Sequence, residues 1–318
     1  MKAGDSDTAA GGRRAALKAL AAGGLALAAG GLAAAPGAVP GSADGGMLRR
    51  RIPSSGELIA AVGLGTYQTF DVADAASPAL AEVLERFVAL DGQVVDSSPM
   101  YGRSESVLGD LSARLGLRDR LFLATKVWTS GRADGIRQME TSLTRLRTRR
   151  LDLLQVHNLL DWRVQLPTLR EWQQQGRIRY LGVTHYHEGA YGEVESVLQA
   201  ERPDFLQINY SMAERDAEVR LLPLARDLGI AVIINRPFAK ASLFSRVRGQ
   251  PLPVWAADFD CASWAQFFLK FILAEPAVSC VIPATGKLAH LEDNLVAGRG
   301  RLPDARQRQR MADYLARL

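Results

Sequence analysis

Eight short runs of largely apolar, strand-forming residues recur along the chain, and a helical pattern follows each of them. This alternation constrains the fold more than any other feature of the sequence. Nearly continuous apolar runs are typical of parallel strands that are covered on both faces. The strand candidates are residues 61–66, 93–98, 121–126, 151–157, 179–184, 205–210, 231–235 and 279–284.

The segments between these runs carry apolar residues at spacings of three and four, which is typical of helices with one buried stripe. In residues 80–90 the stripe consists of Leu80, Val83, Leu84, Phe87 and Val88. The other helical segments are residues 105–115, 136–146, 166–174, 190–198, 219–228 and 264–273, with an eighth that starts near Lys287.

Eight strand–helix units between residue 61 and about residue 298 match the roughly 250 residues that are typical of a TIM barrel. The sequence therefore predicts the α/β class and a (β/α)8 TIM barrel, in a domain that spans residues 57–318. An open doubly wound sheet is the alternative. Its dinucleotide fingerprint is missing, because Gly63 and Gly65 lack a third glycine and a following helix.

The N-terminal segment has the pattern of an export signal. Arg13 and Arg14 precede an apolar stretch of Ala, Leu and Gly that ends in small residues before Pro36. This pattern is typical of a signal peptide, and the paired arginines indicate the twin-arginine route. We expect a twin-arginine signal peptide at residues 1–35, a linker at residues 36–56, and an exported, periplasmic protein. A disordered or membrane-tethering tail is the alternative, although the stretch is shorter than the ~20 residues of a membrane span.

Charge and cysteine content limit the partners that we expect. The formal net charge is +5, and removal of the predicted signal peptide takes away four positive and two negative charges, which leaves +3. That value is too small to indicate a nucleic-acid partner. We expect a monomer, with no stable membrane insertion after processing and with Cys261 and Cys280 as free thiols. The late arginines are expected on the solvated face of a terminal helix: Arg299, Arg301, Arg306, Arg308, Arg310 and Arg317.

Polar residues end three consecutive predicted strands. Asp96, Lys126 and His157 stand at the ends of the second, third and fourth strands, and Tyr101 follows Asp96 by five residues. The catalytic residues of TIM barrels come from the C-terminal ends of the strands. We therefore expect these four side chains to meet at the barrel mouth.

These residue types suit proton transfer to a carbonyl oxygen. Tyr101 can supply the proton, although the ordinary pKa of ~10 is high for this task. A nearby ammonium at Lys126 lowers that pKa, Asp96 holds Lys126 charged, and His157 can donate a hydrogen bond to the same oxygen. A purely structural Asp96–Lys126 ion pair is the alternative, since buried charges usually come paired.

Two further groups carry weaker signals. His185 and His187 do not predict a metal site, because no cysteine or carboxylate cluster completes one. Trp128, Trp162 and Trp255 are candidates either for an apolar substrate pocket or for packing at the barrel rim.

Seven short motifs occur in order along the chain. They are Gly63-Leu64-Gly65-Thr66-Tyr67, Asp96-Ser97-Ser98-Pro99-Met100-Tyr101-Gly102 with Ser104-Glu105, Ala124-Thr125-Lys126, Leu151-Asp152-Leu153-Leu154-Gln155-Val156-His157, Leu181-Gly182-Val183-Thr184-His185, Gln207-Ile208-Asn209-Tyr210, and Val281-Ile282-Pro283 through Asn294. Taken in order, these motifs resemble those of the aldo-keto reductase family, and the resemblance covers nearly all of the chain after residue 57. It implies an NAD(P)H-dependent oxidoreductase that reduces an aldehyde or ketone, acting on the CH–OH group of donors. It also implies Tyr101 as general acid, with Asp96, Lys126 and His157 as its partners.

The same resemblance implies where the nicotinamide lies. Thr184, His185 and Gln207 match the positions that hold the carboxamide, with His185 where Asn is more familiar. Asn235 stands where many members have a Tyr under the ring, so the packing of the ring either passes to Phe238 or is weaker.

The resemblance also implies how the cofactor phosphate is bound. Ala284 and His290 stand where basic residues often bind the 2′-phosphate of NADP, and Lys287 is close enough in sequence to substitute. The implied cofactor is NADP(H), with NAD(H) as the alternative. The implied cofactor-binding residues are Gly65, Thr66, Tyr67, Thr184, His185, Gln207, Asn235, Arg236, Pro237, Phe238, Thr285, Lys287, His290, Asp293 and Asn294.

Two other functions stay open at this point. Lys126 at the end of a barrel strand could form a Schiff base, as in aldolases. That chemistry does not require the spacing of Tyr101 from Asp96. A non-catalytic sensor or interaction barrel that holds a cofactor is the other alternative. Export, the change at Asn235 and the altered phosphate positions favour it, whereas the complete set of four polar residues argues against it.

Overall fold

The computed structural model describes residues 45–73 and 77–318. The predicted signal peptide and residues 36–44 of the predicted linker lie outside the described residues. The strands are β1 Arg49–Arg51, β2 Leu58–Ala60, β3 Leu64–Gly65, β4 Val94–Asp96, β5 Phe122–Val127, β6 Leu151–His157, β7 Ile178–Thr184, β8 Phe205–Asn209, β9 Ala231–Asn235 and β10 Val278–Val281. The α-helices are α1 Pro78–Ala89, α2 Ser104–Arg114, α3 Arg132–Arg145, α4 Trp162–Gln174, α5 Tyr191–Glu201, α6 Leu221–Asp227, α7 Ser242–Arg246, α8 Trp264–Leu273, α9 Leu288–Val296 and α10 Ala305–Ala316.

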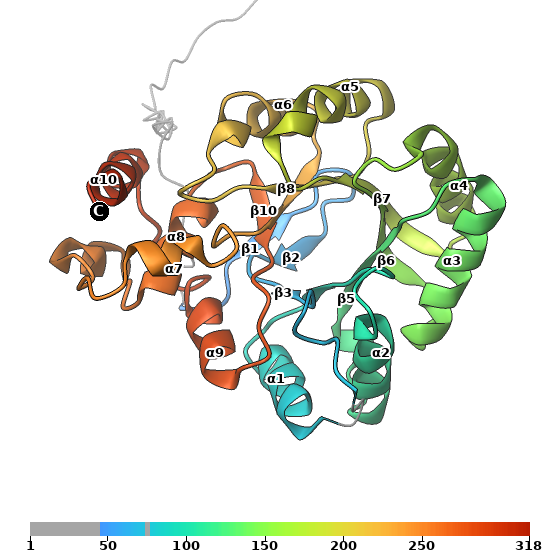
Figure 1. The fold of residues 1–318 in the computed structure, drawn as a ribbon, viewed down its shortest axis with the longest axis horizontal. Coiled ribbons are helices and arrows are strands. Elements are labelled where there is room, and N and C mark those ends of the chain that lie inside the picture. Colours follow the sequence, from blue (N-terminus) through green and yellow to red (C-terminus); the bar gives the residue numbers. More distant parts are fainter. Residues whose placement is uncertain (1–44, 74–76) are drawn as a thin grey trace, which may run out of the picture. The chain divides into compact units, whose positions relative to one another are not determined.

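Eight parallel strands form a closed ring, and the helices surround it (Figure 1). The strands follow one another around the ring in chain order from β3 to β10. Parallel bridges from Val62 to Val281 and from Gly65 to Ala284 join the first strand to the last. The structure is therefore the predicted (β/α)8 barrel.

Glycine at two positions allows the barrel to close at its first strand. A Cβ atom on Gly65 would lie 2.9 Å from the carbonyl oxygen of Ile282, and one on Gly63 would lie 2.7 Å from that of Val94. Both distances are too short for a side chain, so only glycine permits this close approach on both sides of the strand.

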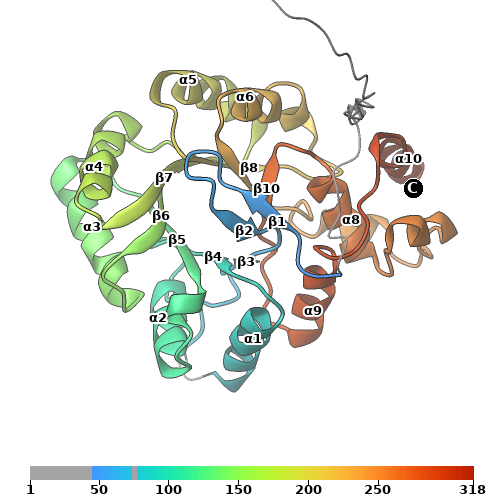
Figure 2. The same cartoon turned by 180° about the vertical axis from the view of Figure 1, so that it is seen from behind.

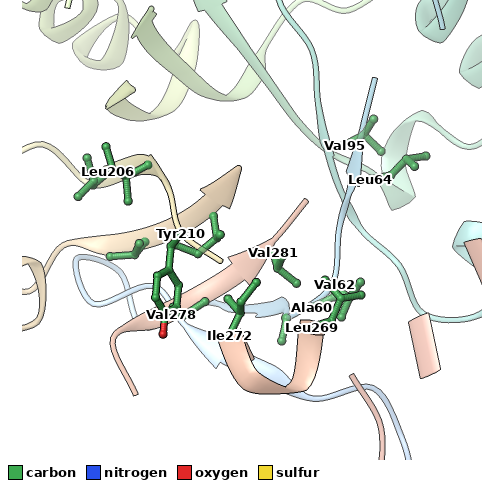
Figure 3. Packing of buried hydrophobic residues seen from close by; sticks show 14 of the residues in the cluster. Ala60, Val62, Leu64, Val95, Leu206, Tyr210, Leu269, Ile272, Val278 and Val281 are labelled. Atoms are coloured by element: carbon green, nitrogen blue, oxygen red, sulfur yellow. The ribbon is translucent and has the colours of Figure 1, made fainter. Parts of the chain in front are cut away.

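Helix α1 shows how the sequence determines the start and the packing of a helix. In α1, Pro78 occupies the first turn and the hydroxyl oxygen of Ser77 accepts the N–H of Leu80 at 3.5 Å. The predicted apolar stripe of this helix is buried throughout. This stripe belongs to the apolar core between the ring of strands and the surrounding helices. Figure 3 shows another part of this core, where Val278 and Val281 of β10 meet Leu269 and Ile272 of α8.

The interior of the barrel is a second apolar core. Successive strand residues point alternately inward and outward, so one side chain in two reaches the interior. This cluster consists of Ile52, Ile59, Val94, Phe122, Ala124, Leu153, Tyr180, Phe205, Ala231, Ile233, Cys280 and Ile282. Ile52 and Ile59 do not belong to the ring. They come from the hairpin of β1 and β2, which lies across the opening of the ring (Figure 2).

This hairpin differs from the linker expected over residues 36–56. Residues 49–51 pair in antiparallel fashion with residues 58–60, and Ile52 is fully buried. The segment looks like a linker because its local composition is polar and rich in Gly, Ser and Pro. Its structure depends on the distant barrel interior, which Ile52 and Ile59 cover.

The C-terminal arginines differ in part from the expected solvated face. The side chain of Arg308 is only 17% exposed, pairs with Glu275 at 3.2 Å and also contacts Glu218. Its Nε atom donates to the carbonyl oxygen of Phe271 at 3.0 Å. Arg308 therefore fastens α10 to the barrel instead of facing solvent.

Two simpler expectations concern the cysteines and the membrane. Cys261 and Cys280 are both buried and unpaired, as expected. Across the described ranges, every helix is too short or too polar to cross a membrane.

Candidate active site

A polar layer lies on top of the apolar interior, at the C-terminal ends of the strands. The inward-pointing register that buries Val94 and Ala124 places Asp96 and Lys126 two residues further along. The same alternation continues around the ring through Gln155, His157, Thr184, Gln207 and Asn235. The closed ring therefore brings together polar side chains from six strands.

The centre of this layer is the ion pair of Asp96 and Lys126. Both side chains are buried, and Nζ of Lys126 lies 2.6 Å from Oδ2 of Asp96. Nζ also donates to the carbonyl oxygen of Ser97 at 2.8 Å. Burial disfavours the ammonium, but the negative charge of Asp96 opposes this effect, and the pKa of Lys126 lies above its ordinary value. Lys126 is therefore a charged group and not a free amine.

Two glutamines fix the other oxygen of the Asp96 carboxylate. Oδ1 accepts Nε2 of Gln207 at 2.8 Å and Nε2 of Gln155 at 3.2 Å. The hydroxyl of Thr184 in turn donates to Oε1 of Gln207 at 3.2 Å. Gln155 is absent from the predicted site residues. Its position two residues before His157, on the same inward face of β6, is the signal that could have identified it.

Tyr101 reaches this layer from the loop between β4 and α2. Its N–H donates to the carbonyl oxygen of Ser98 at 3.0 Å, and Nζ of Lys126 lies 5.2 Å from the centre of its ring. Burial raises the pKa of Tyr101 above its ordinary value, Lys126 lowers it, and Asp96 raises it again. The expected lowering of this pKa by Lys126 is therefore present, but burial is the largest of the three effects and the net shift is upward.

His157 stands beside Tyr101 at the end of β6. The two ring centres are 5.9 Å apart and the rings are nearly perpendicular, at 83°. Nδ1 of His157 lies 3.0 Å from the hydroxyl oxygen of Ser98. Burial, with the nearby charges of Lys126 and His185, lowers the pKa of His157 to about 2. The imidazole is therefore neutral, so it can act as a hydrogen-bond donor but not as a charged acid.

Two exposed aromatic side chains border the site. Tyr67 is 52% exposed, with its ring centre 5.0 Å from that of Tyr101. Trp128 is 41% exposed, and its ring centre lies 6.4 Å from that of His157. Both present exposed aromatic surface beside Tyr101 and His157. Trp255 instead packs against aromatic residues that include Phe259, so it belongs to the rim packing.

The predicted nicotinamide residues lie together on neighbouring strands. The side-chain amide of Asn235 donates to the carbonyl oxygen of His185 at 3.0 Å. Its oxygen Oδ1 is buried and, within the described part of the chain, accepts no hydrogen bond. A buried acceptor without a donor fits a ligand that brings an N–H group, such as a carboxamide.

Arg236 and Phe238 are held by other parts of the protein. Arg236 donates to the carbonyl oxygen of Tyr186 at 2.6 Å and pairs with Glu214 at 3.3 Å. Phe238 packs its ring 4.8 Å from Phe244, in a cluster that extends to α8. Phe238 is thus engaged in packing with this aromatic cluster.

Of the predicted cofactor-binding residues Gly65, Thr66 and Tyr67, the first two are buried and the third is exposed. Gly65 serves the closure of the barrel, and the fully buried hydroxyl of Thr66 donates to the carbonyl oxygen of Asp96 at 3.0 Å. Tyr67 is the residue of this motif whose side chain is exposed at the mouth.

The last predicted motif also divides in this way. Asp293 accepts the hydroxyl of Ser263 at 2.8 Å and the amide of Gln266 at 2.7 Å, so it holds the start of α8. Lys287 and His290 are exposed at the start of α9, whose first turn contains no acidic residue. Both side chains are accessible from solvent. Thr285 accepts the N–H of Lys287, and Asn294 is buried behind them.

Comparison with known proteins agrees with this geometry. The model of the Aldo/keto reductase family matches residues 61–309. The methylglyoxal reductase YeaE of Escherichia coli (strain K12) is 28% identical over 256 residues, which cover 78% of this chain and 89% of the relative. The aldo-keto reductase str7 of Strobilurus tenacellus is also 28% identical, over 67% of this chain and 76% of its own. A crystal structure of an aldo/keto reductase from Klebsiella pneumoniae in complex with NADP and acetate has a TM-score of 0.69 at 25% identity and covers 82% of this chain and 93% of its own.

Proposed function

The chain belongs to the aldo/keto reductase family and is an NAD(P)H-dependent carbonyl reductase, and we propose that Tyr101 is its general acid. The observation that carries this proposal is the position of the tyrosine. Its ring lies 5.2 Å from the Lys126 ammonium and 5.9 Å from the neutral ring of His157, at the open end of the barrel. A proton donor, a cation and a neutral hydrogen-bond donor therefore converge on one point.

The four residues have separate roles in this proposal. Tyr101 gives its proton to the carbonyl oxygen of an aldehyde or ketone, and His157 donates a hydrogen bond to the same oxygen. Lys126 stabilises the tyrosinate that remains, and Asp96 keeps Lys126 charged and in place. When bound, the nicotinamide supplies the hydride that reaches the carbonyl carbon. The product is an alcohol.

NADP(H) is the cofactor that the family and the Klebsiella pneumoniae structure support. The chain's own residues fit it. We infer that Oδ1 of Asn235 accepts from the carboxamide, and that Lys287 and His290 meet the 2′-phosphate at the start of α9. NAD(H) lacks this phosphate and would therefore make no contact of this kind with Lys287 and His290.

The Schiff-base alternative conflicts with the state of Lys126. A Schiff base requires a neutral amine as nucleophile. In this site Asp96 lies 2.6 Å from Nζ and keeps the group charged. The family match also disfavours a non-catalytic barrel. The same conclusion follows from the four polar residues, which are all present and lie together.

We further propose that the enzyme is exported by the twin-arginine machinery and acts as a monomer in the periplasm. The support for export is Arg13-Arg14 ahead of a mildly apolar stretch rich in Ala and Gly. This route carries folded proteins, so the barrel would cross with its cofactor bound.

Replacement of Tyr101 by Phe tests the assignment of the general acid. Methylglyoxal is a suitable first substrate, because the Escherichia coli relative is a methylglyoxal reductase. We expect Tyr101→Phe to lower the rate of reduction by at least about 100-fold, the usual contribution of a general acid. The affinity for NADPH, measured by fluorescence titration, should stay within a few-fold.

The matched control is Tyr314→Phe, which removes a tyrosine hydroxyl from α10 and should leave the rate unchanged. If Tyr101→Phe reduces methylglyoxal nearly as fast as the parent, Tyr101 is not the general acid.

A further inference from the structure

We propose that Ser98 is a positioning residue that fixes the tautomer of His157, so that the proton resides on Nε2 and faces the substrate. The inference rests on the proposed function, because the tautomer matters for catalysis only if His157 donates to the carbonyl oxygen. Ser98 lies in the loop between β4 and α2, and His157 ends β6.

Ser98 contacts both His157 and Tyr101. Its side chain is fully buried, and its hydroxyl oxygen lies 3.0 Å from Nδ1 of His157. Its carbonyl oxygen accepts the N–H of Tyr101 at 3.0 Å. One residue thus connects the loop that carries the acid to the ring that stands beside it.

A count of donors and acceptors decides the direction of the hydrogen bond. A serine hydroxyl has one proton to donate and can accept two. The backbone N–H of Met100 donates to the Ser98 hydroxyl oxygen at 3.3 Å, so this contact occupies an acceptor position. Among the described residues, Nδ1 of His157 is the acceptor that remains for the Ser98 proton.

The opposite arrangement would leave a donor without a partner. If Nδ1 carried the proton and donated it to Ser98, the serine hydroxyl would have two donors facing it and no acceptor. Ser98 has no exposed surface, so water cannot replace the missing acceptor. Buried polar groups without partners are rare because they cost stability. Ser98 therefore donates and Nδ1 is unprotonated.

The remaining proton of His157 then lies on Nε2. The ring is neutral, because burial and the charge of Lys126 lower its pKa, and a neutral imidazole has one N–H. Within the described part of the chain Nε2 makes no hydrogen bond, so this N–H is available to a ligand. A serine, unlike a carboxylate, orients the ring without adding a negative charge that would favour imidazolium.

Nuclear magnetic resonance of the 15N-histidine-labelled protein tests this directly, since only four histidines are present. His157→Gln assigns the signals of His157. In the unmodified protein we expect the chemical shift of an unprotonated Nδ1 and of a protonated Nε2 across neutral pH. Detection of a protonated Nδ1 in the unmodified protein would overturn the proposal.

Two variants add a kinetic measurement. Ser98→Ala should allow both tautomers, move the Nδ1 signal toward the protonated shift, and lower kcat by about tenfold with the KM for NADPH unchanged. Ser98→Thr keeps a hydroxyl and should restore the spectrum and most of kcat. An Ala variant with the spectrum and kcat of the parent would contradict the role of Ser98.

The spectrum separates this proposal from the function on which it rests. If Tyr101→Phe were fully active, the proposed general acid would be wrong, yet the tautomer of His157 would still be measured in the unmodified protein.

Discussion

The pKa of Tyr101 depends on two opposing effects that act on a single hydroxyl. Burial raises it, and the ammonium of Lys126 lowers it. Because the net shift is upward, Tyr101 is protonated at neutral pH and can donate without prior uptake of a proton. Its strength as an acid nevertheless depends on Lys126, which is the cation that favours tyrosinate.

At this scale we predict that Lys126→Met slows reduction by about 100-fold or more. Removal of the ammonium removes the effect that lowers the pKa of Tyr101, and each pKa unit corresponds to ~1.4 kcal/mol. The protonated fraction of Tyr101 falls as the pH rises through its pKa. The alkaline fall in the rate should therefore move to higher pH in the variant, as measured by a pH–rate profile.

The double variant Asp96→Asn, Lys126→Met is the control for folding. Lys126→Met alone leaves Asp96 as a buried, unpaired carboxylate, which is costly. The double variant lacks both charges, so it should recover thermal stability but not activity. Recovery of both stability and rate would show that the ion pair has only a structural role.

At the scale of elements, the hairpin of β1 and β2 supplies stability and not chemistry. Ile59 is buried in the barrel interior, at the end opposite Tyr101, and neighbouring Leu58 is 48% exposed. We predict that Ile59→Ala lowers the free energy of unfolding by about 2–5 kcal/mol, because it leaves a cavity. Urea unfolding measures this change, and kcat per folded molecule should be unchanged.

Leu58→Ala is the matched control for this prediction, since it removes a similar side chain from the same strand without opening a cavity. Equal destabilisation by the two substitutions would mean that the hairpin does not close the interior core.

The start of α9 is the element that we expect to distinguish the two nicotinamide cofactors. Lys287 is exposed there and the first turn has no acidic residue. We predict that Lys287→Ala raises the Kd for NADPH about tenfold, the loss of one charge-assisted contact, and leaves the Kd for NADH within about twofold. Arg149→Ala, which removes an exposed cation just before β6, should change neither value. Equal weakening of both cofactors would place the 2′-phosphate elsewhere.

At the scale of the whole molecule, the proposed export by the twin-arginine route depends on where the cofactor binds. A dinucleotide site built from the ends of several strands exists only in the folded barrel, so export of an unfolded chain would lose the cofactor. We predict that replacement of Arg13 and Arg14 by Lys leaves active enzyme in the cytoplasm. Cell fractionation with mass spectrometry of the released nucleotide measures both consequences. Efficient export of the double-Lys variant, or an exported parent without nucleotide, would contradict this account.

Local patterns were sufficient for the architecture and for the four central residues. Parallel strands buried on both faces leave continuous apolar runs, and each of the eight predicted runs overlaps a strand of the ring. Asp96, Lys126 and His157 are predictable because a closed parallel barrel places all of its strand ends at one mouth. Tyr101 follows from its short distance in sequence from Asp96.

Contacts between residues far apart in the chain required the tertiary structure. Ser98 and His157 are 59 residues apart, and Gln207 reaches Asp96 across 111 residues. Three other features likewise arise only when the ring closes. Phe238 packs against α8, Ile52 covers the barrel interior, and burial raises the pKa of Tyr101 more than the charge of Lys126 lowers it. Sequence periodicity records which face of an element is buried, but hydrogen-bond partners and desolvation depend on what the rest of the chain places against that face.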